Sequence, residues 1–281
     1  MEVNSPITGK RWVSLPFSDH CRPLFNHDSD LQKLVEEIIH LAAHDKIPNL
    51  DLRGVYPSLP ALYTCSKHVI HEIDLSPGEE KVLEHVHNKH RHNIQIALKN
   101  DVKVIQGETI EHLREFYHLH LLTRRRQGVP IQPWRFFQSL KQLFLDREHG
   151  FLLLAYKDGQ CVAGALFLHW KETLTYKYGA SRVENLKYRP NNLVIWTAIQ
   201  WGCENGFTCL DLGRTDLENI GLRRFKSRWG AREIPLFYTS LATNSNHLGE
   251  GKPMQYMHII LQKSPLWVCR LAGELLYKHF G

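Results

Sequence analysis

Cationic side chains cluster in the segment GLRRFKSRWGA, residues 221–231. On a helix, the apolar residues of this segment fall on one face: Leu222, Phe225 and Trp229. Arg223 and Lys226 would then be neighbours on another face. A lysine amine beside a ligand can stabilise negative charge that develops on oxygen, or can bind a phosphate. The alternative is a solvated cationic face without chemistry, which is common on helices.

Two further groups of candidate residues stand where predicted strands end. In the first, Tyr178 precedes Gly179, and a glycine lets a ligand approach the backbone closely, although a plain turn glycine fits equally well. The second group contains Asp211 and Arg214. Asp211 could orient an amine or act as a base, but aspartate also caps turns, and the turn role is the favoured reading.

The remaining candidates lie at a helix start and nearer the amino terminus. Arg189 and Asn191 open a predicted helix whose free N–H groups suit a phosphate or carboxylate, although the intervening proline also explains a simple helix start. Asp19 and His20 stand in a turn where a structural role is favoured over acid–base chemistry. Arg91 suits an anion contact or an interface ion pair. The nearby histidines match no common zinc-ligand spacing, so no metal is expected: His85, His87, His90 and His92.

Alternating helices and strands must position these residues. Hydrophobic periodicity and capping signals predict helices at 31–42, 76–91, 109–126, 134–147, 190–205, 217–229 and 265–280. Strands are predicted at 12–16, 49–53, 67–75, 94–98, 102–106, 151–156, 161–170, 174–180, 207–212 and 234–241. The pair Asp158-Gly159 predicts a hairpin. This order favours an α/β fold with a mixed central sheet and helices on both faces.

Composition limits the class of protein. The 281 residues are 43% hydrophobic and 23% charged, which is normal for a folded soluble chain with a sizeable core. No apolar run is long enough to predict a transmembrane segment, and the first residues have no signal-peptide core. The six cysteines form no CxxC pair and indicate reduced thiols in a cytoplasmic protein. The net charge of +6 favours anionic partners, but no dense basic block predicts a DNA partner.

Several segments, taken in order, carry a family resemblance: LPFSDHCRPL, RHNIQIA, YKYGAS, RPNNLVIW, LDLGRT, GLRRFKSRWGA and the carboxy-terminal SPLWVCRLAGELLYKHFG. This set resembles the FemAB branch of the GNAT-like N-acyltransferases. The resemblance implies tandem GNAT-like lobes. Residues 1–92 would form a partial, incomplete first lobe with a connecting helix, and residues 93–281 a complete second lobe.

The resemblance also implies where the site lies. In a GNAT-like sheet two neighbouring strands splay apart, and their carboxyl ends form the ligand cleft. Lys226 matches the lysine of the family's Phe-Lys motif, which is associated with the acceptor and the reacting centre. The expected catalytic residues are Lys226, Asp211 and Tyr178. The expected substrate-binding residues are Arg189, Asn191, Arg223, Arg214, Gly179, Arg91, Asp19 and His20.

The implied activity is transfer of an acyl or aminoacyl group to a primary amine of a cell-envelope or polysaccharide precursor. The donor would be aminoacyl-tRNA or acyl-CoA, without a tightly bound cofactor, and the partners a phosphate-bearing substrate and charged tRNA. Two departures bear on the donor. The chain has no glycine-rich pyrophosphate loop of the kind that acetyl-CoA-using GNAT enzymes carry, and no long helical hairpin of the kind some tRNA-using relatives carry.

Two rival functions remain open. The first is an acetyl-CoA-dependent N-acetyltransferase of small molecules. The second belongs to another class: a catalytically inactive GNAT-like protein that binds a partner. The incomplete first lobe favours this second rival.

Overall fold

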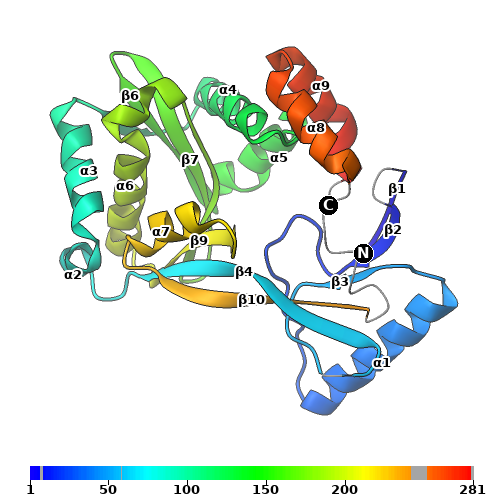
Figure 1. The fold of residues 1–281 in the computed structure, drawn as a ribbon. Coiled ribbons are helices and arrows are strands. Elements are labelled where there is room, and N and C mark those ends of the chain that lie inside the picture. Colours follow the sequence, from blue (N-terminus) through cyan, green and yellow to red (C-terminus); the bar gives the residue numbers. More distant parts are fainter. Residues whose placement is uncertain (7–8, 58, 242–251, 280–281) are drawn as a thin grey trace.

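A computed structural model of the chain describes residues 1–6, 9–57, 59–241 and 252–279. Within these residues a ten-stranded mixed sheet has the order β1-β2-β3-β10-β4-β9-β8-β7-β6-β5 (Figure 1). The strands are β1 (Glu2–Ser5), β2 (Gly9–Val13), β3 (Leu50–Leu52), β4 (Leu62–Asp74), β5 (Lys103–Gln106), β6 (Gly150–Lys157), β7 (Gln160–Trp170), β8 (Thr173–Ser181), β9 (Cys209–Asp216) and β10 (Arg232–Leu241).

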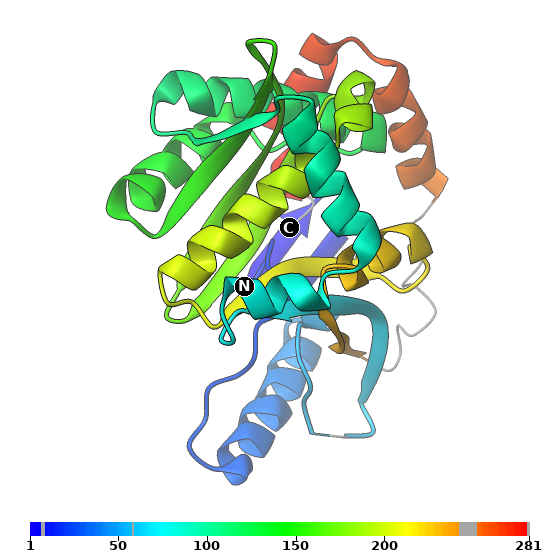
Figure 2. The same ribbon diagram turned by 90° about the vertical axis from the view of Figure 1, so that its left-hand side faces the viewer.

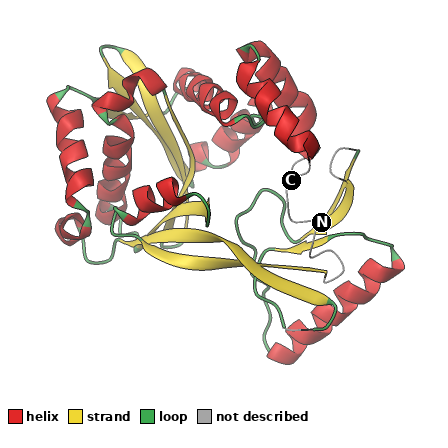
Figure 3. Cartoon of the chain, in the orientation of Figure 1, coloured by secondary structure: helices red, strands yellow, loops and turns green. Residues whose placement is uncertain are grey.

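Helices cover both faces of this sheet (Figures 2 and 3). They are α1 (Asp28–His44), α2 (Glu79–His85), α3 (Asn88–Lys99), α4 (Ile110–Gln127), α5 (Trp134–Leu143), α6 (Pro190–Glu204), α7 (Ile220–Ser227), α8 (Lys252–Lys263) and α9 (Leu266–Leu276). The predicted α/β class, with a mixed sheet and helices on both faces, is confirmed.

The central strands are buried on both faces, which explains their continuous apolar sequences. Along β6, Phe151 and Leu153 face a core shared with α2, α3, α6 and α7. Leu152 and Leu154, pointing the other way, face a second core formed with α4, α5, α8 and α9. Helix α1 covers a third, smaller core at β3.

The boundary that sequence predicts between residues 92 and 93 falls inside α3. The strand predicted at 94–98 is therefore wrong. Ile94 and Ala97 are buried one helical turn apart, and Asn93 is buried beside them, so the segment has helical rather than alternating periodicity. The strands of the two expected lobes belong to one continuous sheet, in which β10 pairs with both β3 and β4. The division into two lobes therefore remains a prediction.

Several element ends differ from expectation. The single helix predicted at 76–91 is divided between two helices, α2 and α3. Helix α2 begins after Gly78, and Ser76, the expected cap, instead donates a hydrogen bond to the Asp74 carboxylate. Helix α7 is shorter than predicted and ends before Trp229. Residues 252–263, expected in a polar loop, form α8; the rest of that loop, at 242–251, and Phe280 lie outside the described residues.

Other local signals are confirmed. Thr109 caps α4 and accepts the His112 backbone N–H at 3.2 Å. The β6–β7 hairpin turns at Asp158 and Gly159, whose φ values of 52° and 72° are those of a two-residue hairpin loop. Pro190 occupies the first turn of α6, as predicted.

Candidate active site

The strands β8 and β9 run parallel and then separate. Their pairing covers Thr173 to Thr175 on β8 against Cys209 to Asp211 on β9, and no pairing follows among the described residues. Each strand also has a register shift against its other neighbour just beyond this point, near residue 177 on β8 and between 211 and 214 on β9. We call the region where residues 176–181 and 212–216 diverge the strand fork.

Gly213 makes the turn of the backbone at the fork possible. Its φ of 76° lies in the left-handed region that favours glycine. The position that a Cβ would occupy is 3.6 Å from both Asp19 Oδ2 and the Tyr176 carbonyl oxygen. The β9 backbone is therefore placed between β8 and the loop that carries Asp19.

Lys226, on the last turn of α7, reaches the fork. Its side chain is only 6% exposed, and its Nζ donates to the carbonyl oxygens of Gly213 at 2.8 Å and Arg214 at 3.1 Å. These contacts use two of the three N–H bonds of an ammonium group. Burial lowers the pKa of Lys226 to about 8, and the carboxylates of Asp211 and Asp19 oppose this shift. The solvated-face alternative is therefore wrong for Lys226.

Asp211 lies buried beside this amine. Its Oδ1 accepts the Gly213 N–H at 2.7 Å, two residues along the chain, so the expected turn-capping role is confirmed. Burial raises the pKa of the Asp211 carboxyl, while the Gly213 N–H and the nearby His20 oppose the rise. The carboxylate thus combines a fixed orientation with increased basicity.

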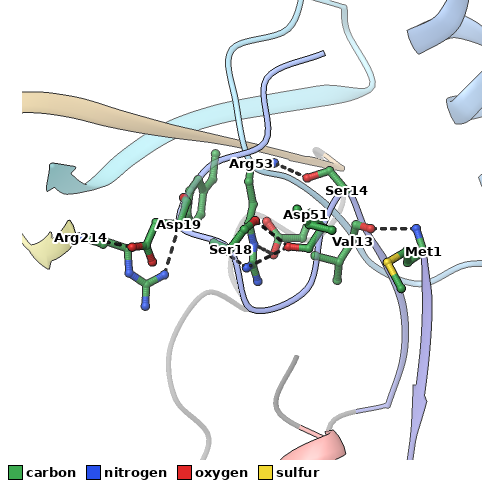
Figure 4. Close-up of polar contacts among 10 residues, drawn as sticks. Met1, Val13, Ser14, Ser18, Asp19, Asp51, Arg53 and Arg214 are labelled. Carbon is green, nitrogen blue, oxygen red and sulfur yellow. Dashed lines mark hydrogen bonds and ion pairs between the residues drawn. The ribbon is translucent and has the colours of Figure 1, made fainter. Parts of the chain in front are cut away.

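A loop from the amino-terminal part closes one side of the fork. Asp19 Oδ2 accepts the Arg214 N–H at 3.4 Å, as Figure 4 shows, and the Asp19 carbonyl accepts the Tyr238 hydroxyl at 2.8 Å. Arg214 Nη1 in turn donates to the Tyr238 oxygen at 3.2 Å. Arg53 holds the loop by donating to the carbonyl oxygens of Leu15, at 3.2 Å, and Ser18.

His20, next to Asp19, is exposed but lies near enough to the fork to act on the Asp211 carboxyl. It also lines a cavity of about 370 Å³ between the loop and strands β4 and β10, together with Arg22 and Phe237.

Tyr178 lies on the β8 side of the fork. Its ring packs against His120, Phe136 and Phe137, at centroid distances of 5.5, 6.2 and 5.6 Å. Burial raises the pKa of the Tyr178 phenol, Tyr277 raises it further, and a hydrogen bond to Gln132 opposes the rise. Gly179 has a structural explanation: a Cβ there would stand 1.5 Å from the Tyr176 hydroxyl, so the Tyr176 side chain already occupies the space.

Arg223 does not share the surroundings of Lys226. It forms a two-point ion pair with Glu233 on β10, with distances of 3.0 and 2.7 Å, and donates to the Leu217 carbonyl. The fully buried His71 places Nε2 3.2 Å from the same Glu233. These contacts attach α7 to the sheet, and Leu222, expected on the apolar face, is exposed.

The other candidates lie apart from Lys226. Arg189 is exposed at the start of α6, with a φ of 58°, and the Asn191 amide donates to the Ser181 hydroxyl at 3.2 Å. Arg91 is exposed on α3 and donates to Asn88. The described contacts bring Lys226, Asp211, Arg214 and Asp19 together, with Tyr178 on the opposite side of the fork.

Sequence reasoning missed a buried polar network behind α7. His90 Nε2 lies 2.9 Å from the Phe225 carbonyl oxygen, and His90 Nδ1 lies 3.1 Å from the Asn192 amide nitrogen. The Asn93 amide donates to Asn192 Oδ1 at 3.4 Å. The spacing of His90 and Asn93 on the apolar side of α3 was the available signal.

Two classes of feature are not seen in the described part of the chain. It contains no cluster of three or more histidine, cysteine or acidic side chains able to hold a metal ion. None of its helices is both long and apolar enough to span a bilayer.

Comparison with known proteins shows which proteins this chain is similar to. Residues 88–227 match the family described as acetyltransferase (GNAT) domain. The chain is 24% identical over 143 residues to the UDP-N-acetylmuramoylpentapeptide-lysine N(6)-alanyltransferase of Weissella viridescens, a match that covers 51% of this chain and 42% of that protein. It is 33% identical over 92 residues to the lipid II:glycine glycyltransferase of Staphylococcus aureus, covering 31% of this chain and 20% of that protein.

Solved structures share the fold. FemX superposes with a TM-score of 0.62 at 14% identity, over 84% of this chain and 86% of FemX. L-PGS from Bacillus licheniformis superposes with a TM-score of 0.54 at 12% identity, over 82% of this chain and 77% of that one. The sequence matches span less than half the length of the two curated relatives. Residues 88–227 match a GNAT acetyltransferase domain, and the chain is similar to two aminoacyltransferases in sequence and to FemX in fold.

Proposed function

We propose that the chain transfers an acyl or aminoacyl group to a primary amine of a cell-envelope precursor. The observation that carries the proposal is the buried Lys226 amine at the strand fork, beside the Asp211 and Asp19 carboxylates. The names of the two relatives, an alanyltransferase and a glycyltransferase, support an aminoacyl group and an acceptor from peptidoglycan synthesis.

The reaction would join the acceptor nitrogen to the carbonyl carbon of the donor. The carbon–nitrogen bond forms, the bond from carbon to the leaving oxygen or sulfur breaks, and the amine proton passes to a base. Negative charge develops on the carbonyl oxygen in the transition state.

Lys226 would stabilise that charge. Two of its N–H bonds are directed to the carbonyls of Gly213 and Arg214, which fixes the amine and leaves a third N–H for the ligand oxygen. With a pKa of about 8 the group is mostly protonated at neutral pH. A donor fixed in advance in a dry site stabilises an oxyanion more strongly than the same donor in water.

Asp211 would orient the acceptor amine and accept its proton. Oδ1 is fixed by the Gly213 N–H, so the acceptor would meet the other carboxylate oxygen. Burial, which raises the pKa of Asp211, makes this carboxylate a stronger base than an exposed aspartate.

The donor would be aminoacyl-tRNA or acyl-CoA, bound only during turnover, and the acceptor a phosphate-bearing precursor. Both donors belong to the cytoplasm, where we place the reaction. Residues 1–92 would act as a partial first lobe that supplies Asp19 to the fork of the second lobe, residues 93–281. The expected roles of Arg91, Arg189, Asn191 and Arg223 in substrate binding would then be secondary.

The test is incubation of purified protein with a muropeptide precursor and either charged tRNA or acetyl-CoA, followed by mass spectrometry of the acceptor. Addition of an aminoacyl mass that depends on Lys226 supports the proposal. Acetylation of small amines alone would instead favour the acetyl-CoA rival. Binding of the precursor without any transfer would favour the inactive binding protein and contradict the proposal.

A further inference from the structure

The helices α8 and α9 expose an unusual amount of apolar surface. Trp267 is 69% exposed, and Leu271 and Leu275, four and eight residues further along α9, are each more than half exposed. This spacing places the three side chains on one face of the helix. Ile259 and Ile260 of α8 are also more than half exposed. Several exposed apolar side chains gathered on neighbouring helices mark an interaction site more often than does a single exposed side chain.

Packing fixes the direction in which this surface points. Both helices pack on α4 through the opposite side, where Leu261 and Cys269 are buried and the Cys269 thiol contacts the Leu261 carbonyl at 3.3 Å. A Cβ on Gly273 would lie 2.3 Å from the Ile131 carbonyl oxygen, so α9 approaches the chain too closely there to rotate. The helices α8 and α9 lie at the edge of the fold, beyond α4 (Figure 1). Because the buried side of each helix faces α4, the exposed stripe points away from the core.

The exposed charges around the stripe are mainly positive, although Glu274 of α9 is exposed as well. Arg126, at the end of α4, and Lys263 and Arg270, on α8 and α9, are all exposed. Gln262 joins α8 to this end of α4 by donating to the Arg126 carbonyl at 3.2 Å. The only acidic residue of the sequence from 252 to 279 is Glu274, whose carboxylate accepts the Trp134 backbone N–H at 3.1 Å.

We propose that the outer face of α8 and α9, called here the docking face, binds the surface of an anionic phospholipid bilayer. Tryptophan and leucine on one face of a short helix insert at the boundary between headgroups and acyl chains. Arginine and lysine beside them are attracted to acidic headgroups near a charged membrane. The helices would lie on the bilayer rather than cross it, because α9 has only 11 residues.

The docking face is joined to the strand fork. Tyr277, in the turn after α9, stacks on Phe17 with ring centroids 4.7 Å apart, and Phe17 lies two residues before Asp19. A docked bilayer would therefore lie one short connection from the loop at the fork. That the docking face brings a membrane-linked acceptor to the fork rests on the proposed function, whereas the binding of the docking face to a bilayer does not.

The experiment is co-sedimentation of the full chain with vesicles of phosphatidylcholine, with and without phosphatidylglycerol. We expect binding only to the vesicles that contain phosphatidylglycerol, and weaker binding as salt rises. Trp267→Glu should weaken binding roughly tenfold or more, because it removes an inserting side chain and adds a negative charge. Trp170→Glu is the matched control, since Trp170 is 71% exposed on β7, outside the docking face. A charge pair completes the set: Lys263→Glu should weaken binding, while Lys99→Glu on α3 should not.

Three results would overturn the proposal: no binding to anionic vesicles at low salt, equal loss in the Trp267 and Trp170 variants, or a dimer in solution that Trp267→Glu converts to a monomer without changing vesicle binding. The last would assign the face to a second copy of the chain. Thermal melting of each variant shows whether it is folded. Because vesicle binding needs no acyl donor, its failure is distinct from failure of the transferase activity.

Discussion

The strand fork and the start of α6 each carry a positively charged side chain, yet the two side chains differ in burial. At the fork Lys226 is buried, with its amine fixed by two carbonyl oxygens and flanked by Asp211. At the start of α6, Arg189 is exposed to solvent. The fork concentrates groups whose pKa values are shifted: burial lowers the pKa of Lys226 and raises that of Asp211.

The difference matters because burying a charged group costs free energy that only a specific environment offsets. An arginine exposed at a helix start is screened by water and salt, so its interactions are weak. Perturbed ionisable groups that converge in one place are typical of reaction centres. We therefore propose that the chemistry takes place at the fork and that the start of α6 contributes only weak attraction of the substrate.

The largest expected effect is that of Lys226→Met. Methionine keeps much of the side-chain volume but removes the N–H donors, so we expect the transfer rate to fall roughly 100- to 1,000-fold, as when an oxyanion donor is lost. Single-turnover transfer to the acceptor amine measures it. A thermal melt checks that the variant is folded. An unchanged transfer rate in a folded variant would contradict the assignment of the chemistry to the strand fork rather than to the start of α6.

Asp211→Asn should have the second-largest effect. Asparagine still accepts the Gly213 N–H but cannot take a proton, so we expect transfer to slow by roughly 10- to 100-fold. Because burial raises the pKa of Asp211, the ionised carboxylate is costly in the folded state, and the variant should melt no lower than the wild type at neutral pH. Slower transfer together with a clearly lower melting temperature would instead indicate a purely structural role.

A smaller effect is expected in the pH dependence of stability. Lys226 has a pKa of about 8 in the fold and 10.5 as its ordinary value, so the unfolded chain binds more protons between these values. The contribution of Lys226 to the free energy of unfolding is therefore lost as the pH falls towards 8. The free energy of unfolding should accordingly rise by about 1 kcal/mol between pH 7 and pH 9. Urea unfolding at both pH values measures the change. Lys226→Met should lack this increment, and the same increment in both proteins would show that Lys226 is not its source.

The smallest effect is expected for Arg189→Ala. The side chain is exposed, so its removal should change the transfer rate by less than about twofold and the stability by less than about 0.5 kcal/mol. The same kinetic and unfolding assays apply. A loss as large as that of Lys226→Met would show that the start of α6, rather than the fork, binds the reacting group.

Sequence predicted the parts of the fold that depend on local signals. The Thr109 cap, the Asp158-Gly159 turn and Pro190 at a helix start act within a few residues, and each appears where expected. Asp211 was also expected to cap its turn, because the favoured hydrogen bond runs only two residues along the chain.

Features that depend on distant contacts were not predictable from sequence in the same way. Arg223 and Lys226, three residues apart, were expected to be neighbours on one helix face, but Glu233 on β10 binds Arg223 and the β9 backbone binds Lys226. The space beside Gly179 belongs to Tyr176, which no spacing rule indicates. The contact of Asp19 with Arg214 joins residues 195 positions apart.

The most direct test of the account is a crystal structure with a phosphonamidate that mimics the tetrahedral intermediate between an adenosine-linked acyl donor and a lysine side-chain amine. We expect a phosphonamidate oxygen within about 3 Å of the Lys226 amine, at hydrogen-bond distance. An analogue bound elsewhere, with Lys226 directed only to the Gly213 and Arg214 carbonyls, would contradict it.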